Sequence, residues 1–267
     1  MSLPQPAAAA TILITGASSG LGEELAHQLA AKGHNVVLVA RREDRLRALA
    51  DDLQRRHGIR ADVLPADLGD PAARERLVTE IDGLDLSLSA VINNAGFGGS
   101  GFFARSDQET EREMVRVNVD ALHHLTGAFV PGLVERGEGA VLNVASLAAS
   151  QPLPLFATYA ATKAFVLSFS EALHAELSGT GVSVTALCPG PVPTEFGERA
   201  GMGDVEETLP SLATVPVEQV AREAIEGMER GRRTVTPGIL MKGASLAGRY
   251  TPRAILLPLT KHGMRAI

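Results

Sequence analysis

The chain has 267 residues, 45% of them hydrophobic, and a formal net charge of −6 at pH 7. This length allows one α/β domain with a large core, and the acidic balance gives no reason to expect a nucleic-acid partner. The single cysteine, Cys188, excludes an internal disulfide and suits a reducing compartment, so we expect a cytoplasmic protein.

The first ten residues, Met1 to Ala10, lack a basic start followed by a long apolar run. They match neither a signal peptide nor a membrane-spanning helix. We expect residues 1–10 to be a disordered lead-in and residues 11–267 to form a single domain, with a basic C-terminal tail from about residue 238.

Short apolar runs alternate with helical patterns along the chain, as in βαβ units. Asp70 before Pro71 indicates a helix start, and Leu46, Leu49, Ala50 and Leu53 form the apolar stripe of another helix. With right-handed crossovers, this alternation predicts an α/β Rossmann-type doubly wound parallel sheet of about seven strands, with helices on both faces. The predicted strands are 11–15, 35–40, 61–66, 89–93, 140–145, 182–187 and 234–236.

A glycine-rich turn, Thr15 to Gly22, directly follows the first apolar run. Gly16, Gly20 and Gly22 permit the turn, whose backbone N–H groups and following helix N-terminus suit a pyrophosphate. Alone this signal is weak, because many helices begin after Gly and Ser.

A Ser-Tyr-Lys group follows downstream. Tyr159 and Lys163 are spaced i and i+4, so they lie on one face of a helix. A tyrosine is a poor base at neutral pH, but a cation roughly 4 Å away at an effective dielectric of about 20 lowers its pKa by up to ~3 units before desolvation is subtracted. Ser146 directly follows the predicted strand 140–145, which places its hydroxyl at the edge where open α/β sheets bind ligands. A lone Tyr-Lys pair is more often a packed tyrosine beside a solvated lysine.

Together and in this order, the two features resemble the short-chain dehydrogenase/reductase family, in its compact single-domain branch. The resemblance covers roughly residues 11–237. The TGxxxGxG motif of that family matches residues 15–22 and its NNAG motif matches residues 93–96. Its helix asparagine, catalytic serine and YxxxK pair match Asn118, Ser146, Tyr159 and Lys163, and its PG segment with a downstream threonine matches Pro189, Gly190 and Thr194.

The resemblance implies a single dinucleotide-binding catalytic domain. Asp67 and Leu68 match contacts to the adenine edge, while the main role of the residues at 93–96 is expected to be structural support. The cofactor-binding residues implied are Gly16, Ser18, Ser19, Gly20, Leu21, Gly22, Arg41, Arg42, Asp67, Leu68, Asn94, Ala95, Gly96, Tyr159, Lys163, Pro189, Gly190, Val192 and Thr194.

The end of the second predicted strand addresses the choice of cofactor. Ala40 is neutral where NAD-preferring relatives place an acid, and Arg41 and Arg42 follow, which favours the 2′-phosphate of NADP(H). Ser18 and Ser19 supply no basic residue inside the glycine turn, so NAD(H) stays possible. The alternative is that both arginines simply begin a solvated helix.

The resemblance also implies a mechanism for an NAD(P)-dependent oxidoreductase acting on CH–OH donors. In reduction, Tyr159 donates a proton to the substrate carbonyl oxygen while hydride arrives from the nicotinamide. Ser146 hydrogen-bonds that oxygen, Lys163 lowers the tyrosine pKa and holds the ribose, and Asn118 holds a water in the proton relay. Oxidation uses the same groups in reverse.

The substrate pocket is expected between residues 97–103, 148–156 and 191 to about 216. These segments are rich in Phe and Leu and poor in charge near the site, so we expect an apolar ketone, aldehyde or secondary alcohol. The alternatives are a 3-oxoacyl carrier or thioester reductase and a non-catalytic NADP(H) sensor, and the intact Ser-Tyr-Lys group argues against the sensor. The expected lining includes Phe97, Phe102, Phe103, Leu153, Leu155, Phe156 and Phe196.

The C-terminal region has a different charge from the rest of the chain. Residues 230–267 hold eight of the 25 Lys and Arg and none of the 31 Asp and Glu. Such a tail, with Ile255, Leu256, Leu257 and Leu259, suits an anionic membrane surface, an acidic carrier protein or the protein's own acidic body. Self-packing or a subunit interface is the more ordinary interpretation of this tail, and we expect a homodimer or homotetramer.

No metal site is expected. His123 and His124 are adjacent on a predicted helix, so their side-chain directions diverge by about 100° and they do not form a ligand pair.

Overall fold

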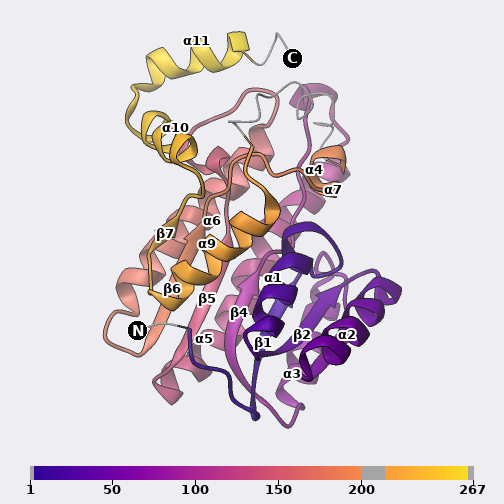
Figure 1. Ribbon diagram of the computed structural model, residues 1–267. Coiled ribbons are helices and arrows are strands. Elements are labelled where there is room, and N and C mark those ends of the chain that lie inside the picture. The colour runs from indigo at the N-terminus through magenta and orange to yellow at the C-terminus, as the bar shows by residue number, and fades with distance from the viewer. Residues whose placement is uncertain (1–2, 200–213, 264–267) are drawn as a thin grey trace.

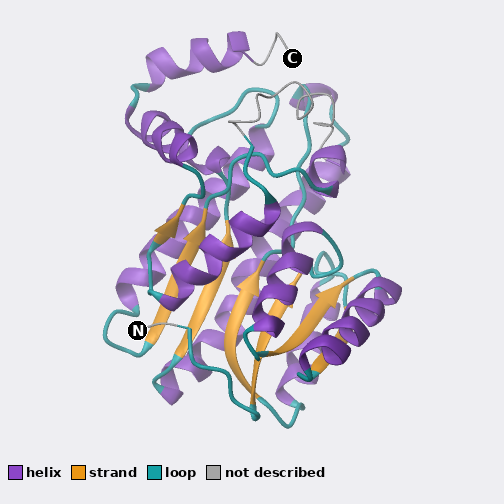
Figure 2. Ribbon diagram, viewed as in Figure 1, coloured by secondary structure: helices purple, strands orange, loops and turns teal. Residues whose placement is uncertain are grey.

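The computed structural model describes residues 3–199 and 214–263 and contains one parallel sheet of seven strands (Figures 1 and 2). The strand order is β3-β2-β1-β4-β5-β6-β7, which confirms the predicted Rossmann-type fold. Each strand begins and ends within about two residues of its predicted range. The strands are β1 (Ala10–Thr15), β2 (Asn35–Ala40), β3 (Ala61–Pro65), β4 (Ser87–Asn93), β5 (Gly139–Val144), β6 (Val182–Leu187) and β7 (Thr234–Val235).

Helices cover both faces of the sheet, and two more lie beyond its carboxyl edge (Figure 1). The α-helices are α1 (Gly20–Ala31), α2 (Glu43–His57), α3 (Pro71–Asp82), α4 (Gln108–Val115), α5 (Leu122–Arg136), α6 (Ala157–Glu176), α7 (Glu195–Arg199), α9 (Val217–Glu229), α10 (Ile239–Tyr250) and α11 (Arg253–Gly263). Two short 3₁₀ segments, η1 (Phe103–Arg105) and η3 (Leu147–Ser150), and a π-helical turn, η2 (Arg116–Ala121), complete the described elements.

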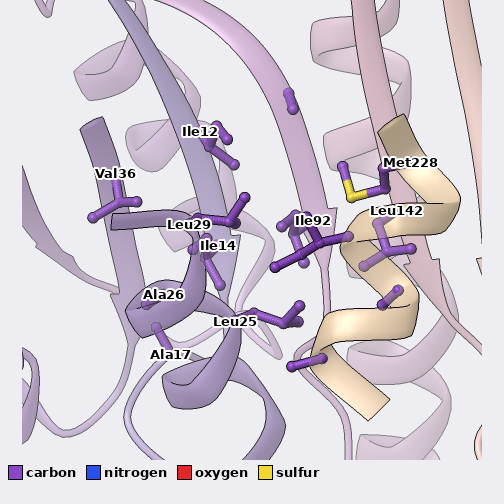
Figure 3. Packing of buried hydrophobic residues seen from close by; sticks show 14 of the residues in the cluster. Ile12, Ile14, Ala17, Leu25, Ala26, Leu29, Val36, Ile92, Leu142 and Met228 are labelled. Atoms are coloured by element: carbon purple, nitrogen blue, oxygen red, sulfur yellow. The ribbon is translucent and has the colours of Figure 1, made fainter. Parts of the chain in front are cut away.

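The strands are apolar on both sides because each face of the sheet is covered. Ile12 and Ile14 of β1 pack with α1 and α9 in one core cluster, whereas Leu13 between them belongs to a cluster with α3 and α5 on the opposite face. Figure 3 shows the first cluster, where Leu29 of α1 lies beside Ile14 of β1 and Met228 of α9 lies beside Leu142 of β5. This two-sided core fixes the strand ends that carry the site.

Two helix predictions are confirmed in detail. Asp70 caps α3, its carboxylate accepting a hydrogen bond from the backbone N–H of Ala72 at 3.0 Å, with Pro71 at the first helical position. The apolar stripe of α2 is buried against the sheet. Its members are Leu46, Leu49, Ala50 and Leu53.

The expected disordered lead-in differs from the structure over residues 3–10. Leu3 is buried, and its N–H donates to the carbonyl of Met228 at the end of α9 at 3.1 Å. Asn35 donates from its side-chain amide to the carbonyl of Ala10 at 2.9 Å. A buried leucine and a buried amide therefore hold this segment against the body, an effect that the alanine-rich composition concealed.

Candidate active site

The glycine turn joins β1 to α1 at the point where the strand order reverses between β1 and β4. Gly16 adopts φ +67°, and a Cβ there would lie 2.9 Å from the Cα of Ala95. At Gly22 a Cβ would lie 2.3 Å from the carbonyl oxygen of Gly16. Glycine at both positions therefore lets α1 and the β4 loop approach the turn closely.

Polar side chains tie the ends of β1 and β4 together. The Thr15 hydroxyl oxygen accepts from the backbone N–H groups of Asn94 and Ala95, each at 3.0 Å. Asn94 donates from its amide to the carbonyl of Thr15 at 2.9 Å, and Asn93 donates to Asn143 of β5 at 2.8 Å. These hydrogen bonds are within the protein, consistent with the structural role expected for this segment.

A cleft of about 480 Å³ lies over this sheet edge. Thirteen of its lining residues are ones that the sequence assigns to the cofactor, namely Gly16, Ser18, Ser19, Gly20, Leu21, Arg41, Arg42, Asp67, Leu68, Asn94, Ala95, Gly96 and Thr194. Phe97 and Phe196, expected on the substrate side, also line it, as does Ala40, the neutral residue at the end of β2. Four further lining residues were not singled out by the sequence, namely Ala66, Glu113, Val117 and Glu195. The size and composition of this cleft suit a dinucleotide.

Six assigned residues lie outside the lining of that cleft. Gly22 packs against the backbone of the turn, next to the carbonyl group of Gly16. The PG segment lies next to Ser146, because Leu147 N–H donates to the Pro189 carbonyl at 2.8 Å. The residues outside the lining are Gly22, Tyr159, Lys163, Pro189, Gly190 and Val192.

The two arginines after β2 have different surroundings. Arg42 turns into the cleft, where its Nη2 donates to the hydroxyls of Ser18 at 3.0 Å and Ser19 at 2.7 Å. Arg41 is more exposed and lies 3.6 Å from the carboxylate of Glu113. The Arg42 contacts favour a role at the cofactor cleft over a purely solvated helix start.

Ser146 lies just beyond the carboxyl end of β5, and Tyr159 lies in the first turn of α6. Ser146 caps η3, its hydroxyl oxygen accepting from the N–H of Ala148 at 3.1 Å. Burial raises the pKa of Tyr159 to about 12, and a hydrogen bond with the Ser146 side chain opposes that rise. At neutral pH the phenol is therefore protonated, so the protein's own groups prepare a proton donor rather than a phenolate.

Lys163 is buried one helical turn from Tyr159. Its ammonium donates to the carbonyl of Val144 at 2.8 Å and lies 5.9 Å from the centroid of the Tyr159 ring. Burial lowers the pKa of Lys163 to about 8. Desolvation therefore outweighs the attraction between the lysine cation and a tyrosine phenolate. It raises the pKa of Tyr159 and lowers that of Lys163.

Asn118 lies in the π-helical turn η2, where the sequence predicts an ordinary helix. Its Oδ1 accepts from the N–H of Phe97 at 3.0 Å, and its Nδ2 donates to the Phe97 carbonyl at 2.9 Å and to the Thr162 hydroxyl at 3.1 Å. A Cβ on Gly96 would lie 2.8 Å from Asn118 Oδ1 and 3.5 Å from Lys163 Nζ. The π turn thereby places this amide between the β4 loop and α6.

The aromatic residues expected around the substrate separate into two groups. Phe196 lies against Tyr159, with the ring centroids 5.8 Å apart. Phe102 and Phe103 are 61% and 54% exposed, and Phe103 lines an outer groove beside Thr162. Residues 200–213 of the expected lining lie outside the described residues.

One loop position is strained. Leu155 has φ +67°, which is unusual for a residue with a side chain, and its carbonyl accepts from the N–H of Gly101 at 2.8 Å. This hydrogen bond links the loops at 97–103 and 148–156, both of which border the expected substrate pocket.

Other site types find no support in the described part of the chain. Over residues 3–199 and 214–263 there is no group of three or more His, Cys, Asp or Glu side chains placed to hold a metal ion. No helix in those ranges is long and apolar enough to cross a membrane. Cys188 is buried beside the site, and burial raises the pKa of its thiol to about 12.

Comparison with known proteins agrees with this geometry. The family model described as short chain dehydrogenase matches residues 10–203. Sulfoacetaldehyde reductase from Chromohalobacter salexigens is 41% identical over 193 residues, which cover 69% of this chain and 73% of that protein. A short-chain dehydrogenase from Sphingobium yanoikuyae, solved in complex with NADPH, has a TM-score of 0.81 at 34% identity and covers 96% of this chain and 95% of its own. A structure of a 7β-hydroxysteroid dehydrogenase has a TM-score of 0.84 at 26% identity, covering 98% and 100%.

The sheet, the glycine turn and these matches define an NAD(P)-dependent oxidoreductase that acts on CH–OH groups. The chain belongs to the short-chain dehydrogenase/reductase family.

Proposed function

We propose that this protein reduces a free carbonyl group with NADPH and uses Tyr159 as the general acid. The observation that carries the proposal is the buried Tyr159 hydroxyl beside the Ser146 side chain, next to the buried ammonium of Lys163 and the dinucleotide cleft. A protonated phenol at neutral pH is the state that carbonyl reduction requires.

The bound nicotinamide supplies the hydride. The Ser146 and Tyr159 hydroxyls would hydrogen-bond the carbonyl oxygen, and Tyr159 would transfer its proton to that oxygen. The charge of Lys163 stabilises the phenolate left behind. Asn118, hydrogen-bonded to Thr162 of α6, would hold the water through which the proton is replaced. Tyr159 and Lys163 also bind the nicotinamide side of the cofactor, together with Pro189, Gly190, Val192 and Thr194.

NADP(H) is the proposed cofactor. Arg42, with Ser18 and Ser19, offers charge-assisted donors for a 2′-phosphate, and Arg41 adds positive charge at the cleft. The matched structure from Sphingobium yanoikuyae holds NADPH, which is compatible with this choice. NAD(H) is the alternative.

The proposed substrate is an apolar ketone, aldehyde or secondary alcohol. Phe196 against Tyr159 supports an apolar wall, and a steroid-oxidising structural relative is compatible with it. Sulfoacetaldehyde, the substrate in the name of the matched reductase, is small and anionic. The two relatives therefore differ in the size and charge of the substrates that they are named for. A 3-oxoacyl thioester remains the second candidate.

We also propose how the molecule associates. The basic, apolar α10 and α11 suit an anionic membrane surface, with an acidic carrier protein as the alternative, and they expose Ile239, Leu246, Tyr250 and Leu259. The outer groove beside α6, with Phe165 exposed nearby, suits a homodimer or homotetramer interface. Residues 11–267 act as one catalytic unit, and a reducing cytoplasm fits the unpaired Cys188.

The deciding test is cofactor oxidation by the purified protein, with NADPH beside NADH. The panel contains apolar ketones, aldehydes, sulfoacetaldehyde and one 3-oxoacyl thioester. Turnover of free apolar carbonyls with NADPH supports the proposal, and turnover of the thioester alone supports the second candidate. Tight NADPH binding without turnover of any compound contradicts both.

A further inference from the structure

A carboxylate from a distant part of the chain faces the arginines at the start of α2. Glu195, the first residue of α7, accepts from Arg42 Nη1 through one oxygen at 3.0 Å and from Arg45 Nη1 through the other at 2.6 Å. These arginines lower the pKa of Glu195 to about 2, so the carboxylate is charged near neutral pH. The sequence assigns neither Glu195 nor Arg45 to the site.

The remaining donors of Arg42 point to the glycine turn. Its Nε and Nη2 donate to the Ser18 hydroxyl at 3.2 and 3.0 Å, and Nη2 also donates to the Ser19 hydroxyl at 2.7 Å. All three guanidinium nitrogens of Arg42 therefore donate hydrogen bonds: Nε and Nη2 to the glycine turn, and Nη1 to Glu195. The two serines, Arg42 and Glu195 all line the dinucleotide cleft.

We propose that Glu195 is an internal competitor of the cofactor's 2′-phosphate for Arg42 and Arg45, and that it thereby limits the preference for NADP(H) over NAD(H). This inference rests on the proposed use of Arg42 for NADP(H), and it adds Arg45 as a second arginine held by Glu195. A carboxylate on the same guanidinium groups repels an arriving phosphate and must give up its hydrogen bonds to it. A ribose hydroxyl carries no charge, so NAD(H) meets no such competition.

The position of Glu195 in the chain gives the competition a structural consequence. Its neighbour Thr194 lies against the glycine turn, because a Cβ on Gly20 would lie 3.2 Å from the Thr194 Cβ. Its other neighbour, Phe196, lies against the Tyr159 ring. Displacement of Glu195 by phosphate therefore acts on a segment that contacts both the cofactor turn and the proposed proton donor.

The test uses two fragments that differ in one phosphate, 2′,5′-ADP and 5′-AMP. Their dissociation constants are measured by calorimetry with the full chain, Glu195→Gln and Glu195→Ala. Both variants are expected to bind 2′,5′-ADP at least about fivefold tighter, a modest gain because the side chains are partly exposed. Binding of 5′-AMP is expected to change by less than about twofold.

A matched control removes a carboxylate of the same kind elsewhere. Glu109 of α4 also accepts from two arginines, Arg116 at 2.6 Å and Arg112 at 3.3 Å, and does not line the cleft. Glu109→Gln is expected to leave the affinities for both fragments unchanged. Placed on an Arg42→Gln background, Glu195→Gln is expected to give a smaller gain for 2′,5′-ADP.

The outcomes separate this inference from the proposed function. If the wild type prefers 2′,5′-ADP and Glu195→Gln leaves that preference unchanged, the competition is wrong while NADP(H) use stands. Equal gains for both fragments, or the same gain in Glu109→Gln, also overturn it. If neither wild type nor variant distinguishes the fragments, the 2′-phosphate role of the arginines fails together with the competition, and carbonyl reduction is judged by its own assay.

Discussion

At the scale of single residues, Tyr159 and Lys163 form an acid–base pair whose pKa values are set mainly by burial. Tyr159→Phe keeps the ring against Phe196 and removes only the hydroxyl. We expect turnover to fall to below a few per cent of wild type, because no other group donates the proton, while NADPH binding stays within about twofold. Steady-state kinetics and calorimetry measure the two. Substantial remaining turnover would remove Tyr159 from its assigned role.

The pKa of Lys163, about 8, predicts a pH dependence of the rate. Reduction needs a protonated Tyr159 and a charged Lys163. We therefore expect kcat/KM for carbonyl reduction to be nearly level at neutral pH and to fall as pH rises above about 8, where Lys163 loses its charge. Oxidation needs the phenolate and is expected to rise with pH over the same range. Rate profiles in both directions, with cofactor saturating, check this; a reduction rate that rises above pH 8 contradicts it.

The same burial predicts a stability cost. The pKa of Lys163 falls from 10.5 unfolded to about 8 folded, so the charged form is disfavoured in the native state by about 3 kcal/mol. Lys163→Met removes that cost and loses one hydrogen bond to Val144, for a net gain of about 2 kcal/mol at pH 7. Between pH 8 and 10.5 the folded wild type binds fewer protons than the unfolded chain, so its stability rises and the gain shrinks.

Denaturant unfolding of both proteins at pH 7 and pH 10 measures this difference. Lys163→Arg is the control, since it keeps a charge that cannot be discharged and offers no gain at either pH. A Lys163→Met protein less stable than wild type at pH 7 would show that the hydrogen bond outweighs desolvation.

At the scale of elements, the β1 turn and α1 depend on close backbone contact. Gly22→Ala places a methyl group 2.3 Å from the Gly16 carbonyl oxygen, so α1 must move away from the turn. We expect a loss of stability of about 2 kcal/mol and at least about tenfold weaker binding of NADPH. Thermal unfolding and fluorescence titration measure both. Gly127→Ala in α5, where a Cβ meets nothing within 4 Å, is the control and should be neutral or stabilising.

The last two helices, α10 and α11, carry Lys242, Arg249, Arg253 and Lys261 and no acidic residue. The last two helices lie beyond the carboxyl edge of the sheet (Figure 1), with the apolar side chains Ile239, Leu246 and Tyr250 along the outer side of α10, opposite the buried Met241. We expect sedimentation with anionic phosphatidylglycerol vesicles but not with neutral phosphatidylcholine vesicles, because both apolar area and charge contribute. Reversal of charge at Lys242, Arg253 and Lys261 should abolish it. Equal sedimentation with both lipids, or none with either, contradicts the membrane proposal.

The sequence by itself determined the strands, the fold class and most of the cleft lining. Buried parallel strands need continuous apolar runs, and a close turn needs glycine, so both are legible in local sequence. The helical spacing of Tyr159 and Lys163 is local as well. The order of residues 3–10 and the π turn at Asn118 could not be predicted from local sequence. They depend on contacts of Leu3 with α9 and of Asn118 with the Phe97 backbone.

Only the tertiary structure decided the balance of forces at the site. The rise in the pKa of Tyr159 and the fall in that of Lys163 come from burial, which depends on the whole surrounding fold. The meeting of Glu195 with Arg42 and Arg45 joins residues 150 and more positions apart. The sequence shows an acid directly after Thr194 and a predicted phosphate-binding arginine at position 42, but local spacing cannot show that two such segments touch.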